Sequence, residues 1–181
     1  VTLVGVINAD TALHFPDFRA AERTFQLVTQ VAGRTGRGER GGRVLVQTFS
    51  PDHPAIVAAM QHDYHRFAAV EIPIRQEHGY PPFCHMARII LRGESETITE
   101  QFGEQIADRL RAESERCEVN VRVLGPAPAP LSKLRGRFRF HLLLLCTQPR
   151  ALHDTVQAAI NDLKTPDEVQ WVVDVDPSDM L

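Results

Sequence analysis

Three polar side chains recur at helical spacing in the segment QVAGRTGRGER, where Gln30, Arg34 and Arg37 lie at i, i+4 and i+7. Because an α-helix turns by about 100° per residue, these side chains would share one face and converge near its C-terminal end. Guanidinium groups aimed at one place suit a triphosphate, whose oxygens accept their paired hydrogen bonds. The alternative is a solvated basic face. Gly33 and Gly36 favour the phosphate site, because each glycine costs a helix about 1 kcal/mol relative to alanine.

A second basic segment, LSKLRGRFRFH, places two arginines and a histidine at every other position. Successive side chains of a β-strand point to opposite faces, so these polar groups would share one face and two phenylalanines the other. Such a row can follow the phosphates of DNA, although the exposed face of any half-buried strand has the same pattern. The candidate DNA-binding residues are Lys133, Arg135, Arg137, Arg139 and His141.

The distribution of charge bears on both candidates. The net charge of −3 argues against nucleic acid on its face, but no acidic residue occurs from Lys133 to Arg150, and residues 19–43 are also rich in arginine. Since salt screens charges beyond about 8 to 10 Å, a basic island can attract anions on an acidic chain.

The composition is that of a globular protein, with 43% hydrophobic and 24% charged residues among 181. The longest apolar run, Leu142 to Cys146, is too short to span a membrane. Cys84, Cys117 and Cys146 are far apart and odd in number, so we expect reduced thiols in a cytoplasm rather than disulfides or a CxxC zinc site. The chain opens at Val1 without a methionine or a signal peptide, and we expect a truncated protein.

The elements that would position these residues fall into two groups. Hydrophobic patterning predicts a β-α-β unit with strands over 2–7 and 43–49 and a helix over 18–31 capped by Asp17. A helix opens at Pro54, with Met60 and Tyr64 on its apolar side, and Pro73 should kink or end it. The turn GYPPF, residues 79–83, is the expected domain boundary.

Beyond that turn the pattern predicts strands over 85–91, 119–124, 137–146 and 169–175, helices over 96–115 and 151–163, and a proline-rich loop, GPAPAP. The order β-α-β-β-α-β is that of the split β-α-β, or ferredoxin-like, arrangement. The expected fold class is therefore α/β followed by α+β.

Other candidates have simpler interpretations. His62 and His65 could be metal ligands, but they lack an evident third ligand, and a surface pair is the simpler interpretation. Cys84 is expected to be a small buried hydrophobic residue. Three acidic residues near the C-terminus could bind a cation, although a solvated terminal strand also explains them. They are Asp174, Asp176 and Asp179.

The pattern Q-x-x-G-R-x-G-R resembles motif VI of superfamily 2 helicases. The stretch from PDFRAAER to FSPDHPA is similar to the second helicase lobe of the bacterial replication-restart helicases, the primosomal protein N′ family. The segments YPPF, LGPAPAP, KLRGRFR and DVDP, in this order, resemble that family's C-terminal domain. The resemblance covers essentially the whole chain.

This resemblance implies the C-terminal part of an ATP-dependent 3′ to 5′ DNA helicase that recognises stalled forks and helps reload the replicative helicase. Gln30, Arg34 and Arg37 match motif VI and would project into the nucleotide cleft, with Arg37 as the arginine finger and Arg34 close by. ATP and Mg²⁺ would be bound by the full-length parent, and the family's zinc sites would lie upstream. We therefore expect this fragment to bind no cofactor and to hydrolyse no ATP.

The resemblance also implies an architecture and partners. Residues 1–52 would form a partial RecA-like lobe 2, 53–80 a helical connector, and 81–181 a ferredoxin-like, ribosomal S10-like DNA-binding domain. Expected partners are forked and single-stranded DNA, single-stranded DNA-binding protein and other primosome proteins, but no membrane. Arg150 and His153 match the family's contacts to an acidic peptide tail. The expected location is the cytoplasm, in association with the nucleoid.

Two other functions remain open from the residues alone. One is a free-standing nucleic-acid-binding adaptor on the ferredoxin-like fold, and the other is a small-molecule-binding regulatory domain. The β-α-β unit discriminates among them, because only the helicase interpretation requires it. Its helix is expected to carry an arginine face, made by Arg19, Arg23, Arg34 and Arg37.

Overall fold

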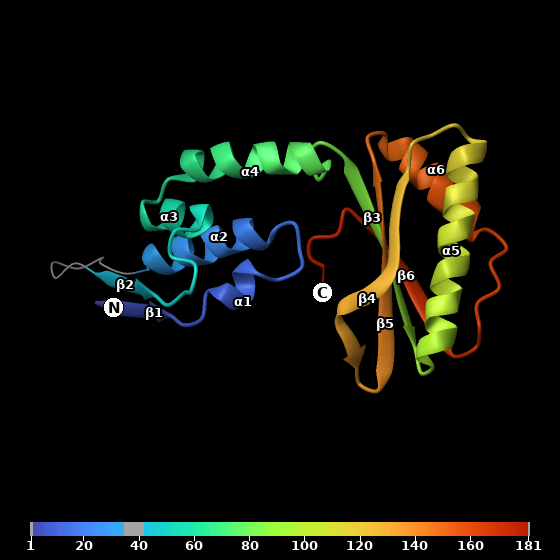
Figure 1. Ribbon diagram of the computed structural model, residues 1–181, viewed down its shortest axis with the longest axis horizontal. Coiled ribbons are helices and arrows are strands. Elements are labelled where there is room, and N and C mark those ends of the chain that lie inside the picture. The colour runs from blue at the N-terminus through green and yellow to red at the C-terminus, as the bar shows by residue number, and fades with distance from the viewer. Residues whose placement is uncertain (1, 35–41, 181) are drawn as a thin grey trace. The chain divides into compact units, whose positions relative to one another are not determined.

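The computed structural model describes residues 2–34 and 42–180, which form a mixed α/β structure with two separate sheets. The chain divides into two compact units, Val1–His78 and Gly79–Leu181 (Figure 1). The predicted mixture of helices and strands is confirmed. Within the described ranges, no helix is both long and apolar enough to cross a bilayer. The predicted motif VI residue Arg37 lies outside the described residues.

The first unit pairs two short parallel strands and packs four helices. Its elements are β1 (Leu3–Val6), α1 (Asp10–Leu13), α2 (Ala20–Ala32), β2 (Arg43–Val46), α3 (Pro54–Met60) and α4 (Tyr64–His78). The core gathers around Phe25 of α2, whose ring stacks on Phe67 of α4 with centroids 4.7 Å apart. Val28 and Ile56 are buried beside them.

Two helix boundaries in the first unit differ from the sequence prediction. Asp17 does not cap α2, because Arg19 is the N-cap; Asp17 instead accepts a hydrogen bond from the Arg19 backbone N–H at 2.9 Å. The single helix expected from Pro54 is two helices, and between them His62 has a left-handed φ of 52°. Both Met60 and Tyr64 are consequently exposed rather than in the core.

α4 continues past Pro73 to His78, so the proline lies inside the helix and does not end it. Arg75 ties this helix to α2, since its Nη2 lies 2.8 Å from Glu22 Oε2 and its Nε lies 2.9 Å from Glu71 Oε1. Part of the core contact between α2 and α4 is thus reinforced by a three-residue ion network.

The second unit is a four-stranded antiparallel sheet with two helices. Its elements are β3 (His85–Gly93), α5 (Glu96–Arg116), β4 (Arg122–Leu134), β5 (Arg137–Cys146), α6 (Pro149–Ile160) and β6 (Val169–Val175). The strand order is β4-β5-β3-β6, and all neighbours are antiparallel. Both helices pack on the same face of the sheet, as Figure 1 shows. The six elements follow the order expected from the sequence.

Alternation along the strands sorts side chains between the two faces. Ile89 and Leu91 of β3 and Leu142 and Leu144 of β5 are fully buried in the core between sheet and helices. The residues between them point to the opposite face, which we call the open face. That face carries the polar groups of β5.

The proline-rich stretch expected to be a loop lies inside β4. Proline has no N–H for a ladder, so it is tolerated in strands mainly at a sheet edge or a bulge. β4 is an edge strand, and its register with β5 shifts between Leu124 and Ala127 and again between Pro128 and Lys133. The prediction of a loop was therefore wrong because the edge position cannot be read from local sequence.

Candidate nucleic-acid interface

The open face carries arginines from two neighbouring strands. Arg88 and Arg92 lie four residues apart on β3, and Arg137 and Arg139 lie two apart on β5. In the β3–β5 ladder, Arg92 is the direct partner of Arg139. Like charges directly opposite each other destabilise a sheet, so this arrangement needs compensation.

Two of these arginines are buried. Arg139 is 5% exposed and Arg88 is 4% exposed. Arg88 has a carboxylate partner, since its Nη2 donates to Asp174 Oδ2 on β6 at 3.1 Å. Arg139 has none among the described residues, and its buried Nε makes no hydrogen bond there. Burial, together with the charges of Arg92 and Arg88, lowers the pKa of the Arg139 guanidinium.

His141 continues the same row toward the middle of the sheet. It is half-buried, opposite Ile90 in the ladder, and its Nδ1 has no hydrogen-bond partner among the described residues. Burial lowers the pKa of the His141 imidazole, and the charges of Arg88 and Arg139 lower it further. This histidine is thus held in its neutral form to lower pH than an exposed one.

The structure separates the five predicted DNA-binding residues. Arg137, Arg139 and His141 share the open face, as the alternation predicted. Arg135 lies in the turn between β4 and β5, where it and Gly136 have positive φ angles of 51° and 81°. Lys133 is the ladder partner of Phe138 and lies over its ring, with Nζ 4.3 Å from the centroid, so it is on the opposite face.

A pocket of about 350 Å³ opens where these side chains meet. It is lined by Arg92, Leu134, Arg135, Arg137, Arg139 and Gln170. Arg137 is partly engaged, because its Nη1 donates to Gln170 Oε1 at 2.7 Å and its Nη2 lies 4.0 Å from Glu94 Oε1. In the described part of the chain, no side-chain hydrogen bond or ion pair is made by Arg92 or Arg135.

Sequence reasoning missed Arg88 and Arg92. Their four-residue spacing in HMARIILRG places both on one face of a strand, so the shared face was readable. Their pairing with β5 was not, because the register between two strands some 50 residues apart is set by the fold.

The motif VI residues lie at the end of α2. Gln30 is exposed in the last turn of the helix, and Arg34 is exposed just beyond the C-cap Gly33. Arg37 falls outside the described residues, so the convergence of the three side chains stays a prediction. Arg23, on the expected arginine face, pairs with Asp17 at 2.9 Å.

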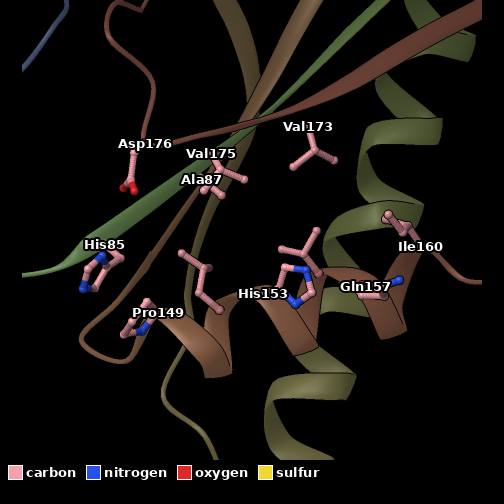
Figure 2. A pocket seen from close by; sticks show the side chains of 11 residues that line it. His85, Ala87, Pro149, His153, Gln157, Ile160, Val173, Val175 and Asp176 are labelled. Atoms are coloured by element: carbon pink, nitrogen blue, oxygen red, sulfur yellow. The ribbon is translucent and has the colours of Figure 1, made fainter.

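A second pocket, of about 320 Å³, lies between α6 and the adjoining strands β3 and β6. Figure 2 shows His153 and Gln157 of α6 facing Val173 and Val175 across it, with His85 and Asp176 at one end. Of the two predicted partner-binding residues, His153 lines this pocket. Arg150 does not line it and is 94% exposed, with Nε 3.9 Å from Asp154 Oδ2.

The weaker candidates have ordinary structural roles. Asp174 is the partner of Arg88, and the Asp176 carboxylate accepts a hydrogen bond from the Met86 backbone N–H at 3.4 Å. Cys84 is buried, as predicted, and its thiol donates to the Gly79 carbonyl at 3.0 Å. Across the described ranges, no three His, Cys, Asp or Glu side chains gather as a metal site would require.

Comparison with known proteins gives consistent matches. The sequence model of the family described as "Primosomal protein N C-terminal domain" matches residues 76–178. Replication restart protein PriA of Bacillus subtilis (strain 168) is 37% identical over 100% of this chain, which covers 22% of that relative. The Haemophilus influenzae protein of the same name is 39% identical over 99% of this chain and 24% of the relative, and the Synechocystis one is 42% identical over 80% and 17%. The chain thus spans about a quarter or less of these relatives.

Proposed function

Because this chain belongs to the primosomal protein N C-terminal domain family, we propose that it is the C-terminal part of an ATP-dependent 3′ to 5′ DNA helicase that restarts stalled replication forks. In this proposal the second unit binds forked and single-stranded DNA through the open face of its sheet. The reloading of a replicative helicase belongs to the whole parent protein.

The observation that carries the DNA-binding part is the arginine cluster at the β4–β5 end of the sheet. Arg135, Arg137 and Arg139 all line the 350 Å³ pocket, and Arg139 is buried. Cations gathered in this way can contact a phosphate backbone without reading bases, because phosphates are the same in every sequence. His141 extends this row of polar side chains toward the middle of the sheet. Lys133, on the opposite face, would approach the DNA from the edge of the hairpin.

The nucleotide part of the proposal rests on motif VI. Gln30, Arg34 and Arg37 would contact the phosphates of ATP, and Arg37 would stabilise the charge of the transition state. The rest of the parent would hold ATP together with Mg²⁺. The sequence contains neither a GKT loop nor a DE-x-H box. We therefore expect this chain alone to turn over no ATP.

The fold assignment is part of the same proposal. The strand order β4-β5-β3-β6 with two helices on one face supports a ferredoxin-like, S10-like domain over 81–181. The parallel pair β1 and β2 joined through α2 supports a partial RecA-like lobe over 1–52, with 53–80 as a connector. The pocket beside His153 is the proposed contact for single-stranded DNA-binding protein or another primosome protein.

Fluorescence anisotropy of labelled single-stranded and forked DNA tests the interface on the whole chain. The double variant Arg135→Glu with Arg137→Glu should weaken binding by about tenfold or more at low salt, and to the same degree for different base sequences. The control, Arg116→Glu with Lys164→Glu, makes the same change in net charge away from the open face. Equal loss of affinity in both variants would refute the proposed interface.

A further inference from the structure

Among the described residues, no carboxylate pairs with Arg139 to balance its charge. The side chain is buried, its Nε has no hydrogen-bond partner among the described residues, and Arg92 stands directly opposite. Burying an unpaired charge costs several kcal/mol in general, and a folded chain seldom retains one without a use. The nearby acids serve others, since Asp174 pairs with Arg88 and Glu94 lies near Arg137.

The pocket above Arg139 has the size and lining of an anion site. Its volume of about 350 Å³ is at the lower end of the roughly 300 to 1,000 Å³ typical of ligand sites. Four of its six lining residues are arginines, and Gln170 holds Arg137 at the rim through a hydrogen bond of 2.7 Å. A guanidinium presents a planar fork of donors that matches two oxygens of one phosphate.

We propose that Arg92, Arg137 and Arg139 form a site for a single phosphate group, in which the bound anion supplies the negative counter-charge that the buried Arg139 does not find among the described residues. Arg135 closes the pocket from the turn. The shared chemistry is a tetrahedral phosphate, which a DNA backbone phosphodiester or a free phosphate ion can supply. That the phosphate comes from a DNA backbone rests on the proposed function, whereas the existence of the anion site does not.

Inorganic phosphate tests the site without DNA. The readout is thermal unfolding of the whole chain followed by fluorescence of Trp171, which is its single tryptophan and lies on β6. Phosphate at about 20 mM, compared with chloride at the same ionic strength, should raise the midpoint of the wild-type protein by about 2 to 5 °C. The shift should be lost in Arg139→Met and reduced in Arg92→Gln, but retained in the control Arg116→Gln.

The substitution of Arg139 also separates binding from a structural role. Replacing a buried, uncompensated charge by an apolar side chain of similar length is often neutral or stabilising. Arg139→Met without phosphate should therefore unfold at the same temperature as the wild type or higher, while losing the response to phosphate. A large fall in its midpoint would assign Arg139 a structural role and overturn the proposal.

DNA binding distinguishes one shared phosphate from a row of separate contacts. Each phosphate contact on a single strand contributes about 0.7 to the slope of log affinity against log salt. If Arg92 and Arg139 hold the same phosphate, the two single variants and the double variant should each lower the slope by about 0.7 or less. A decrease of about 1.4 in the double variant would indicate separate contacts and overturn the single site.

The two proposals can fail independently. A phosphate-dependent shift that depends on Arg139, in a protein that binds no DNA, would support the anion site and contradict the DNA interface. The anion site would be overturned if phosphate did not raise the unfolding midpoint of the wild type and if Arg139→Met and Arg92→Gln bound DNA as the wild type does. The DNA interface would then depend on Arg135 and Arg137 alone.

Discussion

Asp174 of β6 accepts a hydrogen bond from Arg88 of β3 across two adjacent strands, with Nη2 and Oδ2 3.1 Å apart. The Arg88 side chain is 5% exposed and that of Asp174 is 39% exposed, so one partner is enclosed and the other reaches solvent. The carboxylate is therefore the group that permits Arg88 to be buried on a face that already carries Arg92 and Arg139.

Asp174→Asn should destabilise the second unit by about 1 to 2 kcal/mol. Removing one partner of a fully buried pair costs about 3 to 5 kcal/mol, and the exposure of Asp174 reduces this through solvent screening. Urea unfolding followed by Trp171 fluorescence measures the change. The double variant Arg88→Met with Asp174→Asn should recover much of the loss, and failure to recover it would show that Arg88 does not depend on the carboxylate.

His141 should make the second unit less stable in acid. Its pKa is lowered in the folded protein by burial and by Arg88 and Arg139, so the unfolded chain binds the proton more readily. Stability is therefore fully present above the ordinary histidine pKa of about 6.5 and is lost as pH falls from there through the lowered value. Asp174, the described carboxylate that contacts Arg88 on this face, is already paired with that arginine.

His141→Gln should accordingly lose less stability between pH 7.5 and 5.5 than the wild type in urea unfolding. The pKa of His53 is also lowered by burial, but His53 lies in the first unit and Trp171 in the second. His153→Gln, a change of an exposed histidine on α6 of the second unit, is the control and should retain the wild-type pH dependence. Parallel curves for all three proteins would contradict the assignment to His141.

The bounds of β5 and β6 were predictable to the residue, because 137–146 and 169–175 are continuous strand-like runs ended by turn residues. β4 was not, since its prolines are compatible with a strand only at an edge, and edge position is a property of the assembled sheet. Likewise the alternation of Arg137 and Arg139 was visible locally, whereas the opposition of Arg92 to Arg139 depends on register.

The break between α3 and α4 escaped prediction for a related reason. Residues 54–67 carry one apolar pattern, but His62 takes a left-handed φ of 52° that a helix cannot include. Histidine adopts this conformation only occasionally, so its presence gives no clear signal of a helix end. The pairing of Asp174 with Arg88 cannot be read from the sequence either, because 86 positions separate the two residues.

Thiol reagents should distinguish the three cysteines. Cys117, the C-cap of α5, is exposed, whereas Cys84 and Cys146 are buried. Burial also raises the pKa of the Cys84 thiol, which lowers its thiolate fraction. A disulfide reagent at pH 8 should therefore modify one thiol rapidly in the native protein and three after denaturation. Cys117→Ser should abolish the rapid phase, and a rapid phase that persists would contradict the burial of the other two.

Gly125 should be the less replaceable of two glycines with left-handed backbone. Its φ is 99°, and a Cβ there would lie 2.7 Å from the His141 carbonyl oxygen and 3.0 Å from the Ala127 nitrogen, both backbone atoms of the β4–β5 ladder. Gly136, in the turn between the same strands, has a φ of 81° with no atom within 4 Å of its Cβ position. Both substitutions incur backbone strain, but only the first also adds a steric clash.

Gly136→Ala should therefore cost about 1 to 2 kcal/mol of unfolding free energy, which is the strain alone. Gly125→Ala should cost about 3 kcal/mol or more, because the clash must displace β4 from β5 at the point where their register shifts. Urea unfolding of both variants, followed by Trp171 fluorescence, gives the difference directly. Equal costs would mean that β4 moves away without penalty, and the close approach of Gly125 to His141 would then have no role in holding the edge strand.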